Sequence, residues 1–98
     1  MVQMGLATRV RRWARRRSTV WFVAYSHDHP PPHVHGEYAE TTVIVDLLPD
    51  GTIRRSRRRD SVEPANSMRN DIRRILEVAA THAAELMKLW ESAHGSAS

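Results

Sequence analysis

Residues 19–48 read TVWFVAYSHDHPPPHVHGEYAETTVIVDLL, and this stretch decides the fold. Residues 19–25 are β-branched, aromatic and apolar at successive positions, which predicts a strand buried on both faces, with Trp21 in the core. Residues 34–38 begin a second strand, and residues 41–48 continue it or return beside it. In the latter run Val43, Val45 and Leu47 share one face.

The sequence that follows predicts a third strand and then helix. Pro49-Asp50-Gly51 is typical of a tight turn, so residues 52–57 can return as a charged edge strand. Ser61 or Glu63 can cap a helix that has Pro64 at its first position. Apolar residues then recur at spacings of three and four. They are Met68, Ile72, Ile75, Leu76, Ala79, Ala83, Leu86, Met87 and Trp90.

These patterns predict one α+β domain. We expect a small three-stranded, mostly antiparallel sheet packed by one long C-terminal helix or by two with a break near residues 80–82, ended by Gly95. Residues 1–18 are expected to form a basic N-terminal arm with one or two amphipathic turns, residues 19–94 the domain, and residues 95–98 a frayed tail.

Composition narrows the classes of function. The 98-residue chain has no cysteine, which excludes disulfides and thiolate metal sites. No apolar run approaches the roughly 18 residues of a membrane span, so the sequence predicts a soluble, cytoplasmic protein with no membrane partner. A chain of this size would gain stability from self-association or from a small partner protein.

Arginine is concentrated in two segments that hold eleven of the 15 cationic residues. The first contains Arg9 and the second lies in residues 54–59. The arginines that we predict as contacts to nucleic-acid phosphates are Arg11, Arg12, Arg15, Arg16, Arg17, Arg54, Arg55, Arg57, Arg58 and Arg59. A solvated basic face, an acidic protein partner or GC-rich codon usage explains the same residues equally well. No recognition helix, zinc finger or aromatic RNA-binding motif accompanies them.

Four side chains between the first two strands point to chemistry. Asp28, His29, His33 and His35 are predicted ligands of a divalent metal such as zinc, manganese or iron, because imidazole and carboxylate suit these ions. Three consecutive prolines are expected to hold the intervening backbone in a stiff extended form. His33 and His35 project from one face if their segment is a strand.

Two other interpretations of the same residues stay open. In the first, the histidines donate hydrogen bonds to Asp28, to nearby glutamates or to carbonyl groups and merely fix the loop. In the second, His33, His35 and Asp28 are catalytic without a metal, as a His–Asp base and its orienting carboxylate. His27 is expected to be an exposed neighbour, and His82 a half-buried helix residue.

The order of these elements resembles a bacterial family, domain of unknown function 4160. Its members carry an aromatic strand, an Asp-His, a Pro-Pro-His-x-His and an acidic strand, then a helical Glu-Leu with a tryptophan shortly after. Here these are Tyr25, Asp28-His29, Pro31-Pro32-His33-Val34-His35, Glu40, then His82, Glu85-Leu86 and Trp90. Gly36 stands where an apolar strand residue is more usual, and the arginine content is higher than typical.

The resemblance covers roughly residues 8–94 and implies a compact α+β domain, often encoded beside another small protein in an arrangement like a toxin–antitoxin pair. It implies no established activity. We therefore hypothesise a regulatory, toxin–antitoxin-type interaction module that acts through a partner protein, nucleic-acid backbone or both. The alternative is a metal-dependent or His–Asp hydrolase, for example a ribonuclease, that uses the histidine cluster.

Overall fold

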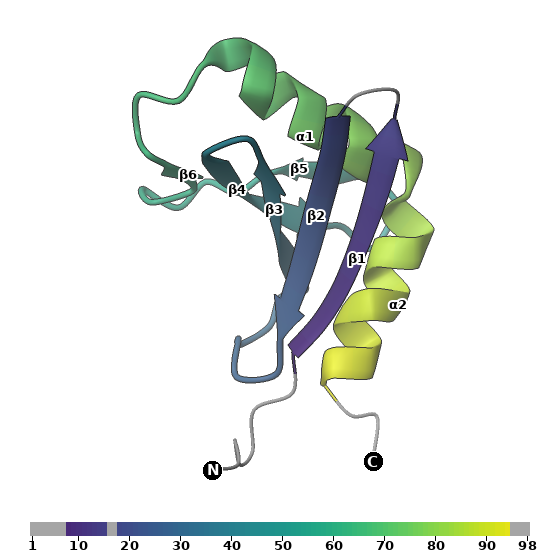
Figure 1. Cartoon of the computed structure of the whole chain (residues 1–98). Helices are drawn as coiled ribbons and strands as arrows, with labels where there is room; N and C mark the ends of the chain where they lie inside the picture. The colour runs from purple at the N-terminus through teal and green to yellow at the C-terminus, as the bar shows by residue number, and fades with distance from the viewer. Residues whose placement is uncertain (1–7, 16–17, 95–98) are drawn as a thin grey trace, which may run out of the picture.

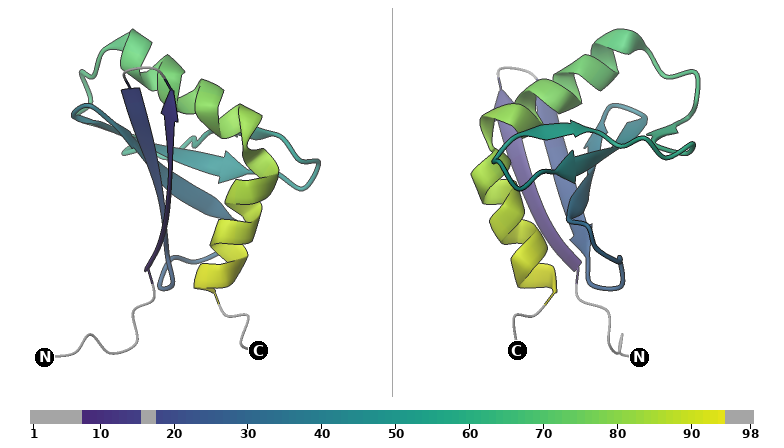
Figure 2. Two further views of the ribbon diagram at one scale, coloured as in Figure 1. Left: turned by 45° about the vertical axis from the view of Figure 1, so that its right-hand side comes forward. Right: turned by 180° about the vertical axis from the view of Figure 1, so that it is seen from behind.

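The computed structural model describes residues 8–15 and 18–94. In that part of the chain an antiparallel sheet is followed by two helices, which confirms the α+β class. The elements are β1 (Thr8–Arg15), β2 (Ser18–Tyr25), β3 (His33–Tyr38), β4 (Thr41–Leu47), β5 (Ile53–Arg55), β6 (Val62–Glu63), α1 (Arg69–Thr81) and α2 (Ala83–Ala93). The strand order is β1-β2-β3-β4-β5, and β6 also pairs with β4. The sheet twists strongly, and both helices lie on one side of it (Figures 1 and 2).

The predicted number of three strands is wrong, because six strands are found among the described residues. Residues 8–15, which the sequence placed in an arm with helical turns, form β1 and pair with the whole of β2, from Thr8 opposite Tyr25 to Arg15 opposite Ser18. The many arginines of this segment hid its extended conformation, since its pairing partner rather than its own propensity determines it. Arg16, Arg17 and the predicted tail, residues 95–98, lie outside the described residues.

Alternation along β2 sorts its side chains between two faces. Val20, Phe22 and Ala24 are at most 1% exposed and face the helices with the rest of the core. Trp21 points the other way and is 40% exposed, so its assignment to the core is wrong. A run that is apolar at every position does not reveal that only one face of its sheet is covered by helices.

The predicted turn and return after β4 are confirmed. Gly51 has a φ of 88°, and its N–H donates to the Leu48 carbonyl oxygen at 3.0 Å. Glycine adopts this left-handed conformation without the steric cost that a side chain would add. β5 is shorter than the predicted 52–57, but Arg54 and Arg55 are exposed on it, as expected of a charged edge.

The helices break where the sequence predicts and begin later than it predicts. His82 is the C-cap of α1 and the N-cap of α2. Ile75, Leu86 and Trp90 are buried against the sheet. The capping positions proposed at Ser61, Glu63 and Pro64 are wrong, because β6 occupies residues 62–63 and α1 starts at Arg69. Met68 precedes the helix and is 67% exposed. No helix in the described ranges is long and apolar enough to cross a membrane.

Gly36 sets how closely α1 approaches β3. A Cβ atom built at this position would lie 2.5 Å from Ile75 Cγ2 and 2.8 Å from Phe22 Cε1, closer than such atoms can approach. The glycine therefore makes room for two of the largest fully buried side chains. Glycine at this position therefore permits the close packing of α1 on β2 and β3.

Candidate metal centre

The loop that joins β2 to β3 carries the site. The backbone N–H of Asp28 donates to the Tyr25 carbonyl oxygen at 3.1 Å and turns the chain just after β2. The Leu47 N–H donates to the Pro32 carbonyl oxygen at 3.0 Å and ties the far end of the loop to β4. The prediction of a stiff, extended proline bridge is wrong, because the backbone bends at Pro30 and Pro31. Backbone hydrogen bonds hold this bent loop at both ends.

Asp28, His33 and His35 meet at one point. The Oδ2 atom of Asp28 lies 3.2 Å from Nε2 of His33 and 3.1 Å from Nε2 of His35. One ligand atom from each residue lies within 4.8 Å of the other two, and this is the group of potential metal ligands found in the described part of the chain. The two histidines lie two residues apart on β3 and so share a face.

These separations suit a first-row metal ion. Ligand atoms about 2.1 Å from an ion lie about 3.0 Å apart at a right angle and about 3.4 Å apart at a tetrahedral angle. The two observed distances, 3.1 and 3.2 Å, fall between these values. Two imidazoles and one carboxylate leave further coordination positions open for water or substrate. The carboxylate oxygen therefore lies at a ligand-to-ligand distance from each of the two imidazoles.

The hydrogen bonding of His33 fixes which ring nitrogen faces the cluster. Its Nδ1 lies 2.9 Å from the Pro31 carbonyl oxygen, which can only accept, so Nδ1 carries the proton. In a neutral ring the Nε2 lone pair then points at the Asp28 carboxylate, and a cation or a second proton must separate the two. Metal-bound histidines commonly donate their other N–H to a carbonyl group in this way. Pro31 is thus the supporting partner that the sequence alone did not identify.

Aromatic rings hold the two histidines in place. Tyr25 packs edge-on against His35, with ring centroids 5.1 Å apart, and Trp90 from α2 lies 5.2 Å from His33. The side chains of Asp28, His33 and His35 are 17%, 11% and 22% exposed. The cluster is therefore shielded but still reachable from solvent, which is what a site that exchanges a ligand requires.

The structure brings together three of the four predicted metal ligands. His29 is exposed and lies outside the three-residue group, although it lines the neighbouring cleft. His27 is exposed, as expected. His82 is half-buried and its Nδ1 lies 3.2 Å from Glu85 Oε1 at the break between the helices.

Sequence reasoning missed His94. This residue caps the end of α2, stacks on Trp90 with ring centroids 3.6 Å apart, and reaches the Asp28 carbonyl oxygen with Nε2 at 2.9 Å. It connects the end of the helix to the loop of the site, and Figure 1 shows these two segments at the same end of the molecule. The sequence around position 94 does not predict this contact, because the two residues lie 66 positions apart in the chain.

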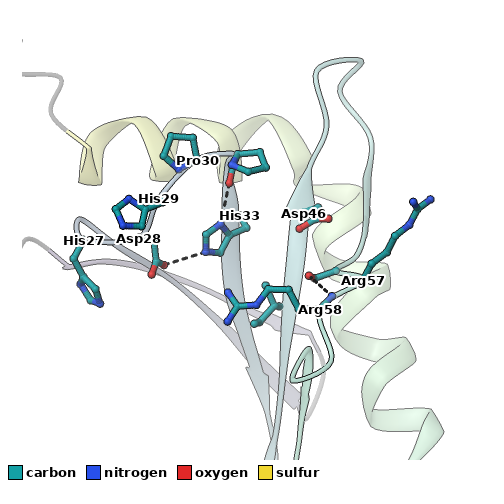
Figure 3. Close-up of a pocket in the computed structure, with 11 residues that line it drawn as sticks. His27, Asp28, His29, Pro30, His33, Asp46, Arg57 and Arg58 are labelled. Atoms are coloured by element: carbon teal, nitrogen blue, oxygen red, sulfur yellow. Dashed lines mark hydrogen bonds and ion pairs between the residues drawn. The ribbon is translucent and has the colours of Figure 1, made fainter.

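An open cleft of about 630 Å³ begins at the cluster. One wall comes from the β2–β3 loop and the start of β3, with Asp28 and His33 (Figure 3). The opposite wall comes from β4 and the segment after β5, with Asp46, Arg57 and Arg58. His35 does not line this cleft, so two of the three clustered side chains face it directly.

Three arginines of the second cluster have different side-chain partners. Arg54 Nε lies 3.2 Å from Asp46 Oδ2, and Arg55 Nε donates to Ser61 Oγ at 3.3 Å. Arg58 makes two bonds of 3.1 Å to the carboxylate of Asp60.

Of the remaining predicted phosphate contacts, two have side chains that the structure describes. Arg57 and Arg59 are exposed and form no ion pair with another residue that the structure describes. The side chains of Arg11, Arg12 and Arg15 lie outside the described part of the chain, as do Arg16 and Arg17 entirely.

Comparison with known proteins places the chain in a family. The model of the family "Domain of unknown function (DUF4160)" matches residues 19–91, a span that includes the cluster, the residues that line the cleft, α1 and most of α2. No curated protein and no solved structure matches the chain. Because the match covers most of the chain, the protein belongs to the DUF4160 family.

Proposed function

We propose that this protein is a divalent-metal-dependent hydrolase whose ion is held by Asp28, His33 and His35. The observation that carries the proposal is the convergence of one carboxylate oxygen and two Nε2 atoms, with the His33 ring oriented by the Pro31 carbonyl group. Two imidazoles and a carboxylate suit zinc, manganese or iron and leave coordination positions open.

The cleft beside the cluster supports a reaction rather than a purely structural ion. A divalent ion held by Asp28, His33 and His35 would activate a water molecule near neutral pH and polarise the substrate bond. Asp28 and His33 face the cleft, so a substrate lying there would be within reach of the ion. In hydrolysis, the water oxygen forms a bond to the electrophilic atom, the bond to the leaving group breaks, and the leaving group takes the proton. No electron acceptor is needed.

Metal titration tests the first half of the proposal. Untagged protein stripped with chelator is titrated with Zn²⁺, Mn²⁺ and Co²⁺ by calorimetry, and the Co²⁺ complex is followed by its visible spectrum. We expect one ion per chain in the wild type and in His29→Ala, and none at the same concentrations in Asp28→Asn or in the folded His33→Ala/His35→Ala double variant. Equal binding by Asp28→Asn and the wild type would overturn the site.

Hydrolysis of simple chromogenic esters tests the second half. The metal-loaded wild type is assayed with p-nitrophenyl acetate, p-nitrophenyl phosphate and bis(p-nitrophenyl) phosphate. We expect turnover of at least one ester that disappears with chelator, returns with metal and is absent in Asp28→Asn. Turnover that survives chelation would instead support the metal-free His–Asp mechanism, and no turnover of any ester would contradict the hydrolase.

A specific observation also favours the interaction module as a second candidate. Arg57 and Arg59 are exposed without an ion pair among the described residues, and Val10 and Trp21 are large apolar side chains that are 47% and 40% exposed. Unpaired guanidinium groups are suited to nucleic-acid phosphates or to an acidic partner protein of the toxin–antitoxin type.

Salt dependence tests this second candidate. Binding of single-stranded and double-stranded RNA and DNA is measured by fluorescence anisotropy between about 50 and 200 mM salt. If the arginines contact phosphates, Arg57→Gln/Arg59→Gln should weaken binding and reduce the salt slope by about 1–2. Affinity and slope identical to the wild type would contradict the nucleic-acid form of the module.

A further inference from the structure

Arg58 lies at the edge of the cleft, and both its side chain and its backbone form hydrogen bonds. Its Nε and Nη2 atoms donate to the two carboxylate oxygens of Asp60, each at 3.1 Å. Its backbone N–H donates to Ser56 Oγ at 3.1 Å, and its carbonyl oxygen accepts from the Ser61 N–H at 3.1 Å. Ser56 and Ser61 are buried. The backbone of residue 58 is therefore held in place, and Asp60 orients the guanidinium group, which lowers the entropy lost when a ligand binds.

The side chain of Arg58 extends toward the cluster of Asp28, His33 and His35 (Figure 3). Arg58 and the pair Asp28 and His33 line opposite walls of the same cleft. Figure 3 shows the Arg58 side chain extended toward the histidine side, whereas the guanidinium group of Arg57 points away from it. Asp60 occupies the edge formed by Nε and Nη2, so the edge formed by Nη1 and Nη2 is the one left for a ligand.

The charge around Arg58 stays positive despite its carboxylate partner. Residues 54–60 contain five arginines and one acidic residue. Arg58 and Asp60 are each 57% exposed, so water and salt weaken their mutual attraction and leave the guanidinium group able to bind an anion.

We infer that the cleft binds the phosphoryl group of a phosphate ester between the metal held by Asp28, His33 and His35 and the free guanidinium edge of Arg58. This inference rests on the proposed hydrolase and names its substrate class. Phosphoryl oxygens match the planar fork of arginine, and a cation on each side of the group is the usual way to stabilise its charge. A neutral carboxylic ester has a single carbonyl oxygen and no use for the second cation.

The reaction balances without a co-reactant. The water oxygen forms a new bond to phosphorus, the P–O bond to the alcohol breaks, and the alcohol oxygen takes the proton that the water has lost. Arg58 neutralises the non-bridging oxygens in this step and exchanges no proton, since guanidinium stays charged at physiological pH.

Inorganic phosphate is the probe. Its affinity is measured by calorimetry on chelator-treated and Mn²⁺-loaded protein, for the wild type, for Arg58→Gln and for the matched control Arg73→Gln. The control removes the same charge from an exposed arginine of α1 that does not line the cleft. We expect Arg58→Gln to weaken phosphate binding about tenfold to hundredfold, and Arg73→Gln to change it by less than about threefold. Equal weakening by both variants would reduce the effect to net charge and overturn the inference.

Two competition experiments distinguish a phosphomonoester substrate from a phosphodiester substrate. A 5′-mononucleotide presents a phosphomonoester, and a dinucleotide without terminal phosphates presents a phosphodiester. Competition with inorganic phosphate by one of them, dependent on Arg58, identifies the class. Competition by neither overturns the inference.

Failure here is separable from failure of the metal site. Arg58→Gln should bind Mn²⁺ as the wild type does, because Arg58 touches none of the three ligands in the contacts of the described residues. Metal binding without Arg58-dependent phosphate binding overturns the substrate class alone. If the wild type binds no metal, the proposed hydrolase is overturned. The contribution of Arg58 to phosphate binding is measured separately, in the chelator-treated protein.

Discussion

Nε2 of His94 lies 2.9 Å from the backbone carbonyl oxygen of Asp28. The C-cap residue of α2 therefore contacts the residue whose carboxylate belongs to the cluster. The same ring stacks on Trp90, which in turn packs against His33. Two of the three candidate ligands are therefore supported from the C-terminal helix. The loop of the site is thus contacted by a residue from near the other end of the chain.

Replacing His94 should weaken metal binding without abolishing the fold. We expect His94→Ala to reduce Co²⁺ affinity about tenfold to hundredfold, as loss of an outer partner of a ligand typically does, and to destabilise the protein by about 1 kcal/mol. His94→Gln keeps an N–H donor and should restore most of the affinity. His82→Ala removes a histidine at the helix break and is the matched control. Equal Co²⁺ affinities in His94→Ala and His82→Ala would show that the contact only stabilises the helix end.

Metal removal should lower stability by an amount set by the free ion concentration. At an ion concentration of about 100 times the Kd, a bound ion contributes about 2.7 kcal/mol to the free energy of unfolding. Chelator should remove this contribution from the wild type and from His29→Ala. Asp28→Asn should unfold at the same temperature with and without metal. A metal-dependent shift of the same size in Asp28→Asn would place the ion elsewhere.

Gly36→Ala should destabilise the core by about 1–3 kcal/mol, because its Cβ would overlap Ile75 Cγ2 and Phe22 Cε1. Chemical denaturation of Gly36→Ala, Ile75→Ala and the double variant measures the coupling between the two positions. Ile75→Ala removes the nearer of the overlapping atoms, so the double variant should lose less stability than the two single losses added together. Strict additivity would contradict steric overlap as the cause.

The turn after β4 should add a small acid-sensitive contribution to stability. Hydrogen bonds from the hydroxyl and backbone N–H of Thr52, at 2.6 and 3.0 Å, lower the pKa of Asp50 below its ordinary value of 3.8. Because the folded state favours the carboxylate, the contribution is present above pH 3.8 and is lost as the pH falls through the lowered pKa. Asp50→Asn should therefore have a lower urea midpoint than the wild type near neutral pH, and the difference should shrink in acid. A difference that is constant with pH would exclude this origin.

Part of the arrangement of the cluster can be predicted from the sequence. Strand alternation predicts that the two imidazoles of the PPHVH segment lie on one face of a strand, and His33 and His35 do so on β3. The position of Asp28 beside them depends on the path of the loop between β2 and β3. His94 and the Pro31 carbonyl group could not be predicted, because each acts through a contact that only the folded loop creates. The exclusion of His29 likewise depends on the path of the loop.

The fold shows the same division between local and long-range information. The break at His82 and the turn at Gly51 follow from local patterns, and both are found. β1 was missed because its extended conformation depends on pairing with β2. The exposure of Trp21 could not be foreseen either, since it depends on which face of the sheet the helices cover.

The segment that carries Arg57, Arg58 and Arg59 leaves and rejoins the sheet at a single residue. The Ser56 N–H donates to the Ile44 carbonyl oxygen at 2.9 Å, and the Ile44 N–H donates to the Ser61 carbonyl oxygen at 2.8 Å. These two bonds fix the strand register on both sides of residues 57–60. We therefore expect substitutions within this segment to change one wall of the cleft while Asp28 and His33 on the opposite wall keep their positions.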